Sequence, residues 1–333
     1  MKITILGSGG WGTALANLLS NNGHTVTLWS FLAEECENLK KTRENPFLKG
    51  IALHPNIAFT NDLDSVSGAE MVVFATPSFA IRKTAENVKD LLPTNCVLVS
   101  VTKGIEAGTS LRMSEIISAV TGKTVAVLSG PSHAEEVGRG IPTGCVAACK
   151  DREVAELVQT TFMSDNFRVY STDDVTGVEL GAALKNVIAL CAGISDGMGC
   201  GDNTKALLMT RGLTEMARLG IKLGSRKETF AGLTGVGDLI VTCTSMHSRN
   251  RRAGILIGQG KTVEEAMQEV GAVVEGYYAA KSAWELAQKT GADMPIMQQA
   301  YAVLYEGKDP HEALNILMTR TKQSELEDSG WDK

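Results

Sequence analysis

A lysine lies in the middle of a long stretch of small and apolar residues. The stretch covers residues 179–195, and Lys185 stands at its centre next to Asn186. A lysine is rarely buried without a partner, and loss of water around its ammonium lowers its pKa toward neutrality. Such a group can give or take a proton in catalysis. The alternative is a lysine whose stem lies on apolar neighbours while its ammonium reaches solvent, and the stretch alone favours that alternative.

A glycine-rich motif follows the first predicted strand. Residues 2–6 are β-branched and apolar, and Gly7, Gly9 and Gly12 come next with the spacing Gly-x-Gly-x-x-Gly. Helix-forming residues follow, and residues 25–29 form the second predicted strand. The first glycine permits a tight turn, the second lets the backbone approach a pyrophosphate, and the third permits close packing of helix and strand. In this setting the motif predicts dinucleotide binding rather than a structural turn.

The acid that usually marks an NAD site is missing from its expected place. In NAD-binding proteins this acid lies about 20 residues after the motif, at the end of the second strand, and it binds the ribose 2′-hydroxyl. Ser30 and Phe31 occupy this place, and the first acid is Glu34. The absence of an acid admits NADPH, and Ser30 can donate to a 2′-phosphate, but no arginine is there to hold it. NADPH and NADH both remain open.

Strand and helix patterns continue to alternate up to residue 170. Further strands are predicted at residues 71–75, 97–101, 124–128, 144–149 and 167–170. Continuous apolar runs are typical of parallel strands that are covered on both faces. Lys103 and the turn at residues 130–134 follow two of these strands, so both would lie at the carboxyl edge where doubly wound sheets bind ligands. The alternatives are a solvated loop lysine and an ordinary turn.

The pattern changes to long helices after Ser171. We therefore predict an α/β fold: a Rossmann-like dinucleotide-binding domain with a mostly parallel sheet over residues 1–175, followed by an all-α domain over residues 176–322 that carries catalytic and substrate-binding groups. A polar tail is expected over residues 323–333. A chain of 333 residues is also too long for a single compact core.

Two acidic residues of the second half stand in unusual surroundings. Asp238 is isolated among the glycines and apolar residues of 232–244, and Glu275 lies between valines and a glycine. An aspartate in a glycine-rich segment usually belongs to a turn. The pattern around Glu275 predicts a loop.

Arginines cluster at the predicted start of a helix. Ser248 is a natural N-cap, and Arg249, Arg251 and Arg252 follow it. Cations are unfavourable at a helix N-terminus because the helix dipole is positive there, whereas an anion is stabilised. The cluster therefore favours a phosphate site, with a solvated basic patch as the alternative.

The bulk composition excludes several classes of function. The net charge is −6 without blocks of like charge, so neither nucleic acid nor an anionic membrane is an expected partner. The sequence has no long uninterrupted apolar run and no secretory leader, so no stable membrane insertion is expected. Seven scattered cysteines without a C-x-x-C pair favour reduced thiols in a cytoplasm, and the histidines do not cluster with them into a metal site.

Taken together, the motifs resemble those of the bacterial NAD(P)-dependent glycerol-3-phosphate dehydrogenase family. The resemblance covers about residues 2–320 and rests on residues 7–12, 102–104, 130–132, 184–187, 235–239, 242–244 and 248–251. It implies reversible reduction of dihydroxyacetone phosphate, a phosphorylated triose, to sn-glycerol 3-phosphate by NADPH or NADH. It also implies a supply of product to phospholipid synthesis and a homodimer.

The resemblance further implies roles for individual residues. Lys185 matches the catalytic lysine, and Lys103 matches a residue near both cofactor and substrate. Substrate positions are matched by Lys103, Gly130, Ser132, Lys185, Asp238, Ser248, Arg249 and Asn250. Cofactor positions are matched, beside Gly7, Gly9 and Gly12, by Gly10, Trp11, Phe31, Lys103, Ala134, Arg249, Val273 and Glu275. His133 stands where many members have phenylalanine, and members vary at Phe31.

These matches give a mechanistic hypothesis. Lys185 is the general acid, Asp238 holds its ammonium, Lys103 adds positive charge, and Arg249 with the N–H groups after Ser248 binds the substrate phosphate. A β-hydroxyacid or ketopantoate-type reductase is the nearest alternative, but it does not need this phosphate site. A non-catalytic dinucleotide sensor is a second alternative, and it would not need a lysine in an apolar helix.

Overall fold

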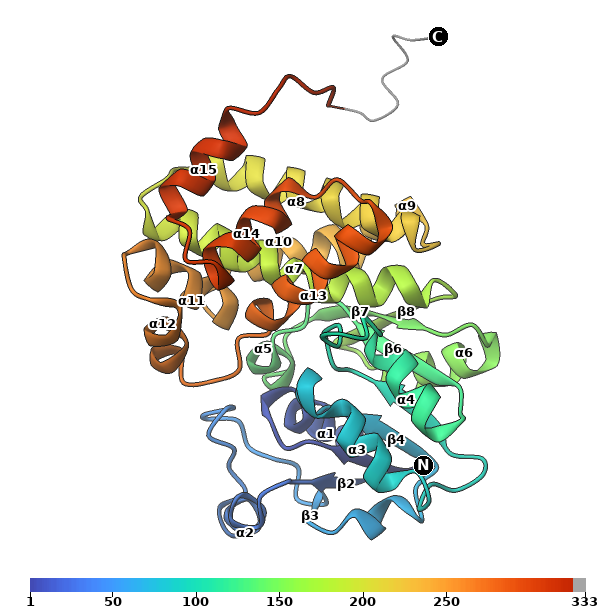
Figure 1. Ribbon diagram of the computed structural model, residues 1–333. Coiled ribbons are helices and arrows are strands. Elements are labelled where there is room, and N and C mark those ends of the chain that lie inside the picture. The colour runs from blue at the N-terminus through green and yellow to red at the C-terminus, as the bar shows by residue number, and fades with distance from the viewer. Residues whose placement is uncertain (326–333) are drawn as a thin grey trace.

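Eight strands form one sheet in the N-terminal half of the protein, which the computed structural model describes over residues 1–325 (Figure 1). Their order is β3-β2-β1-β4-β5-β6-β7-β8, and all neighbours are parallel except β6 and β7. The first six have the order of a doubly wound nucleotide-binding sheet. The strands are β1 (Lys2–Leu6), β2 (Thr25–Trp29), β3 (Ala58–Thr60), β4 (Met71–Phe74), β5 (Val97–Ser100), β6 (Val125–Ser129), β7 (Thr143–Ala148) and β8 (Phe167–Thr172).

Seven of the strands lie where the sequence predicts them, within two residues at each end. The exception is β3, which has only three residues and pairs with β2 at the edge of the sheet. So short an edge strand has no apolar run that would distinguish it from a loop.

Helices cover both faces of the sheet. They are α1 (Gly10–Asn21), α2 (Ala33–Thr42), α3 (Ile81–Val88), α4 (Met113–Thr121), α5 (Ala134–Gly138) and α6 (Arg152–Phe162), with 3-10 turns η1 (Leu63–Val66) and η2 (Ser78–Ala80). Successive strand residues point to opposite faces. Val73 accordingly belongs to the core shared with α1 and α6, whereas Val72 and Phe74 belong to the core shared with α3 and α4.

The second half of the described chain is helical, which confirms the predicted fold class (Figure 1). Its elements are α7 (Val175–Gly197), α8 (Asp202–Lys222), α9 (Lys227–Phe230), the π-helical turn η3 (Leu233–Gly237), α10 (Asp238–Thr244), α11 (Arg249–Gly258), α12 (Val263–Val270), α13 (Glu275–Thr290), α14 (Pro295–Tyr305) and α15 (Pro310–Met318). Of the predicted polar tail, residues 326–333 lie outside the described part of the chain.

Two local predictions in this half are wrong. Asp238 does not lie in a turn but begins α10, and Glu275 does not lie in a loop but begins α13. The glycines before Asp238 serve close packing: a Cβ on Gly235 would come within 1.9 Å of the Phe230 carbonyl oxygen. A segment that looks like a flexible turn is therefore a compact helical one.

Helix α7 is the centre of the helical half. It is long and apolar enough to cross a membrane, but 94% of its most apolar window is buried inside the protein, as in a core helix. Glycines let α11 approach it backbone to backbone. A Cβ on Gly193 would lie 2.1 Å from the Arg251 carbonyl oxygen, and one on Gly254 would lie 2.1 Å from that of Leu190. This contact brings the start of α11 beside the middle of α7.

Candidate functional site

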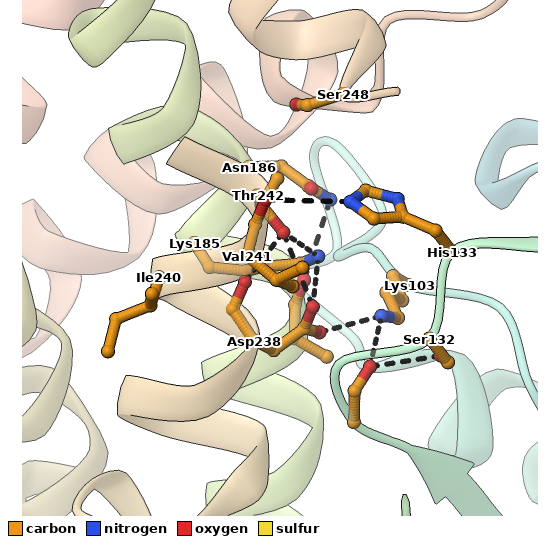
Figure 2. Close-up of polar contacts among 12 residues, drawn as sticks. Lys103, Ser132, His133, Lys185, Asn186, Asp238, Ile240, Val241, Thr242 and Ser248 are labelled. Carbon is orange, nitrogen blue, oxygen red and sulfur yellow. Dashed lines mark hydrogen bonds and ion pairs between the residues drawn. The ribbon is translucent and has the colours of Figure 1, made fainter. Parts of the chain in front are cut away.

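The ammonium groups of two lysines bind opposite oxygens of one buried carboxylate (Figure 2). Lys185 Nζ on α7 lies 2.6 Å from Asp238 Oδ1, and Lys103 Nζ, after β5, lies 2.6 Å from Asp238 Oδ2. Lys185 is only 5% exposed and Asp238 only 1%. The interpretation of Lys185 as a surface lysine that reaches solvent is therefore wrong. Asp238 does face Lys185, as the mechanistic hypothesis requires.

Both ammonium groups have a second partner. Lys185 Nζ donates to Thr242 Oγ1 at 2.6 Å, and Lys103 Nζ donates to the Gly130 carbonyl oxygen at 3.1 Å. Ser132 Oγ donates to the same carbonyl oxygen at 3.0 Å. An ammonium carries three protons, so within residues 1–325 each lysine keeps one proton without a protein partner. These protons are available to a ligand.

The electrostatics bring Lys185 close to its titration range. Burial lowers its pKa to about 8; Asp238 opposes this effect, and the nearby charge of Lys103 adds to it. Burial alone would raise the pKa of Asp238, but Lys103 and Lys185 hold it below its usual value. The cluster thus combines a carboxylate that stays ionised with an ammonium that can lose its proton near neutral pH.

His133 lies near the cluster of Lys103, Lys185 and Asp238 (Figure 2). Its Nε2 is 3.5 Å from the Val241 carbonyl oxygen. Burial and the charge of Lys185 lower the pKa of His133, which favours a neutral ring.

The glycine motif forms a cradle at the end of β1, where β1 lies between β2 and β4. Gly7 has a φ of +127°, and a Cβ there would come within 2.7 Å of the Ala75 carbonyl oxygen; a Cβ on Gly12 would lie 2.0 Å from that of Gly7. Gly9, by contrast, faces open space, and α1 begins at Gly10 without a side-chain cap. The free N–H groups and the open space fit the pyrophosphate of a dinucleotide.

The remaining predicted cofactor residues lie in different surroundings. A Cβ on Gly10 would lie 3.6 Å from that of Ala134, which begins α5. Trp11 has a buried ring nitrogen without a partner in the described chain. Phe31 is 77% exposed and meets Trp29 edge to face. An exposed aromatic ring at this place is free to stack on a base.

Glu275 connects the two halves of the protein. Its carboxylate accepts hydrogen bonds from Ser78 Oγ at 2.6 Å and from the Ser78 N–H at 3.3 Å. Burial raises the pKa of Glu275, although the hydrogen bonds from Ser78 act in the opposite direction. Val273 lies just before α13, and a Cβ on Gly104 would lie 2.6 Å from that of Ser78. The site is thus closed by elements of both halves.

Only part of the arginine cluster is available to an anion. Ser248 caps α11 by accepting from the Arg251 N–H at 3.2 Å, whereas the Arg251 guanidinium pairs with Asp196 at 2.8 Å. The idea of a common anion for all three arginines is therefore wrong for Arg251, which is already neutralised. Figure 2 shows Ser248 above the lysine–aspartate cluster.

Arg249 and Arg252 have no hydrogen-bond or ion-pair partner within residues 1–325, and the Nε atom of Arg252 is buried. Arg249 is the more exposed of the two and stands at the first helical position of α11. It keeps contact with solvent, yet the surrounding protein lowers its pKa, with Glu275 opposing this effect. Next to it, Asn250 Nδ2 donates to Asn186 Oδ1 at 3.0 Å, and Asn250 Oδ1 accepts from the Gly276 N–H at 2.8 Å. This network fixes the start of α11 against α7 and α13.

Several residues of the site were not predicted from the sequence. Thr242 lies four residues after Asp238, so a helical assignment would have placed both on one face. No sequence signal connects Ser78 with Glu275 or Asn250 with Asn186, because these pairs are distant along the chain. Glu35 was also missed; it lies beside Ser30 at the end of β2.

The fold and the site together define a dehydrogenase that uses a dinucleotide: a glycine cradle at the switch point of a doubly wound sheet, beside a buried lysine with a free proton. A family model for the N-terminus of NAD-dependent glycerol-3-phosphate dehydrogenase matches residues 2–155, and the model for the C-terminus of the same family matches residues 174–315. The chain belongs to the NAD(P)-dependent glycerol-3-phosphate dehydrogenase family.

Individual relatives support this assignment. Glycerol-3-phosphate dehydrogenase (NAD(P)+) from Thermoanaerobacter sp. is 54% identical over 98% of this chain and 99% of the relative. The enzyme from Fusobacterium nucleatum is 52% identical over 98% of this chain and 99% of the relative. Among solved structures, glycerol-3-phosphate dehydrogenase from Coxiella burnetii has a TM-score of 0.93 at 37% identity and covers 96% of this chain and 99% of its own.

The alternative reductase is related only by fold. A ketopantoate reductase from Ralstonia eutropha has a TM-score of 0.61 at 14% identity, and the match covers 94% of this chain and 100% of the reductase. A likeness at this identity concerns the arrangement of the elements and not the chemistry of the site.

Proposed function

We propose that the protein catalyses the reversible reduction of dihydroxyacetone phosphate to sn-glycerol 3-phosphate with NADPH or NADH, and so supplies phospholipid synthesis. The observation that carries this proposal is the buried Lys185, which is paired with Asp238 and left with a free proton. Asp238 also binds Lys103, which follows β5 in the sheet that carries the dinucleotide cradle. The names of the similar proteins support the choice of substrate.

The residues of the cluster divide the chemical work. A bound reduced nicotinamide supplies a hydride for the carbonyl carbon of the substrate. Lys185 meets the negative charge that grows on the carbonyl oxygen and gives it a proton. Asp238 keeps the Lys185 ammonium in place, and Lys103 adds positive charge nearby. In the oxidation of glycerol 3-phosphate, neutral Lys185 accepts the proton from the hydroxyl group.

The start of α11 would bind the phosphate of the substrate. Arg249 has no partner in the described chain, and the N–H groups after Ser248 lie at the positive end of the helix dipole. Asn250 is held by Asn186 and Gly276, so this end cannot shift freely. Gly130 and Ser132 lie beside Lys103 and would complete the substrate site.

The primary test is an assay with dihydroxyacetone phosphate. Oxidation of NADH and of NADPH is followed by absorbance, each with this ketone and with ketopantoate. We expect turnover with dihydroxyacetone phosphate only. Turnover with ketopantoate alone would favour the alternative reductase, and binding of a dinucleotide without turnover on either ketone would favour a sensor.

The phosphate site is tested with Arg249→Ala. A charged hydrogen bond to phosphate is lost, so KM for dihydroxyacetone phosphate should rise about 10- to 100-fold, with a smaller effect on kcat. Arg152→Ala is the matched control, because Arg152 pairs only with Glu156 on the exposed side of α6. An equal KM in the two variants would contradict the assignment of Arg249.

Three further parts of the proposal concern the whole protein. We infer that it acts as a cytoplasmic homodimer, as the family resemblance implies, and that residues 1–175 and 176–322 are its two domains. The free state of all seven cysteines agrees with a reducing compartment. Light scattering of the purified protein would measure its mass, and a monomer at micromolar concentration would contradict the dimer.

A further inference from the structure

A carboxylate of α2 lies at the end of β2, next to the glycine motif. Glu35 Oε2 is 3.1 Å from Ser30 Oγ and 3.4 Å from Ser8 Oγ, and Ser8 Oγ lies 2.8 Å from Ser30 Oγ. Ser8 belongs to the glycine motif and Ser30 follows β2 directly. The chain of hydrogen bonds thus joins three elements at the edge where the cofactor cradle lies.

The direction of these hydrogen bonds determines what this corner can bind. An ionised carboxylate only accepts hydrogen bonds, so Ser30 donates its proton to Glu35, and Ser8 donates to Ser30 or to Glu35. Both hydroxyl protons are then used within the protein. Glu35 is exposed, and its Oε1 has no partner within residues 1–325. A ligand that reaches this corner meets a negative charge and must itself donate.

In a doubly wound sheet this corner receives the adenosine ribose of the cofactor. A ribose with a free 2′-hydroxyl can donate to a carboxylate there. A 2′-phosphate would be repelled by the same charge, and it would find Ser30 already engaged with Glu35. The two forms of the cofactor are therefore distinguished by one group.

Glu35 has no ion-pair partner within residues 1–325. The lysines of α2, Lys40 and Lys41, lie in its last turn, whereas Glu35 lies in the first. Residues 30–39 contain neither lysine nor arginine. Arg43, the arginine that follows α2, donates to the carbonyl oxygens of His54 and Ile57 and lies over the ring of Phe59. It is held away by these contacts, whereas a site for a 2′-phosphate needs a free guanidinium or ammonium.

We propose that Glu35 makes this dehydrogenase selective for NADH over NADPH. It supplies, from the first turn of α2, the acid that is missing from the end of β2. This inference rests on the proposed function, since it concerns the cofactor of that reaction.

Direct binding tests it without turnover. Calorimetric titration would give Kd values of NADH and NADPH for the unchanged protein, for Glu35→Gln and for Glu34→Gln. Glu34 is the matched control, because it lies in the same helical turn and has the same charge but makes no hydrogen bond within the described residues. Thermal unfolding of each variant would verify that it is folded.

We expect the unchanged protein to bind NADH at least about tenfold more tightly than NADPH, the size of one charged hydrogen bond. Glu35→Gln should reduce this ratio about tenfold, with tighter NADPH and weaker NADH binding, while Glu34→Gln keeps it. Rising salt should reduce the ratio in the unchanged protein, because salt screens the repulsion.

Two outcomes would overturn the inference: equal Kd values in the unchanged protein, or the same change of ratio in both variants. In either case the proposed function stands, since both dinucleotides still bind. Failure of both dinucleotides to bind would contradict the proposed function as well.

Discussion

Lys185 owes its properties to two opposing effects on one ammonium group. Burial and the charge of Lys103 favour its neutral form, and Asp238 favours the charged form. The result is a pKa of about 8, close to the pH at which a general acid is most useful. A lysine on a surface helix would keep its proton throughout the physiological range.

The pH dependence of the reaction follows from this pKa. In the proposed mechanism reduction needs protonated Lys185, so kcat/KM for dihydroxyacetone phosphate should fall as the pH rises through about 8. Oxidation of glycerol 3-phosphate needs the neutral form and should rise over the same range. Steady-state rates in both directions between slightly acidic and alkaline pH would measure this, and parallel profiles in the two directions would contradict it.

Removal of the proton donor is the complementary experiment. Lys185→Met should reduce kcat by about 10²- to 10⁴-fold, the usual contribution of general acid–base catalysis. Binding of NADH should remain, because the glycine cradle lies on a different element. A variant with near-normal kcat would exclude Lys185 as the acid.

At the scale of elements, the contact of α7 with α11 determines where the residues of the proposed phosphate site lie. Four glycines, Gly193, Gly197, Gly254 and Gly258, each lie so close to the facing backbone that a Cβ would come within 2.2 Å of a carbonyl oxygen. Arg249 and Asn250 are the first residues after the cap of α11. Any separation of the two helices would move them away from Lys185.

Gly254→Ala tests this contact. The added Cβ would meet the Leu190 carbonyl oxygen at 2.1 Å, so the helices must move apart, at a cost of about 1–3 kcal/mol in the free energy of unfolding. Gly68→Ala is the control, since nothing lies within 4 Å of its Cβ, and it should change stability by less than about 0.5 kcal/mol. Urea unfolding would compare them, and equal stability would show that the helices can accommodate the methyl group.

At the scale of the whole molecule, the two halves are joined by the same residues that form the site. Asp238 and Glu275 of the helical half bind Lys103 and Ser78 of the sheet half. Farther along α7, Glu179 accepts hydrogen bonds from the Ser114 N–H and hydroxyl. Because these contacts are buried or partly buried, we expect the site and the arrangement of the halves to be lost together on unfolding.

The reactivity of the cysteine thiols measures how well the core is closed to solvent. Burial raises the pKa of Cys145, Cys191 and Cys243 to about 12, and only a thiolate reacts readily with disulfide reagents. In the native protein near pH 8, we expect the partly exposed Cys200 to react first, and the other thiols only after unfolding. Titration with a chromogenic disulfide would count them, and Cys200→Ser should remove the rapid phase. Rapid reaction of several thiols in that variant would contradict a closed core.

Local sequence patterns predict most of the elements, and the order of the motifs indicates the family. The β1–glycine–α1 unit, most strands, the Ser248 cap and the order of the motifs depend on neighbours along the chain, and backbone preferences act over that range. Partners at long range could not be predicted in this way. Asp238 lies 53 residues from Lys185 and 135 from Lys103. Its glycine-rich surroundings predicted a turn, and only the family resemblance connected it with Lys185.

The other charge pairs depend on packing between segments that are distant along the chain. The tertiary structure buried Lys185 in the middle of α7 and paired Arg251 with Asp196, while Arg249 has no protein partner within residues 1–325. It also brought Glu35 to Ser30, at the place where β2 lacks an acid. The physical reason is that a charge is stabilised by whatever partner packing places within a few ångströms, and burial greatly strengthens that choice. Neither the partner nor the burial of a side chain is encoded in its immediate neighbours.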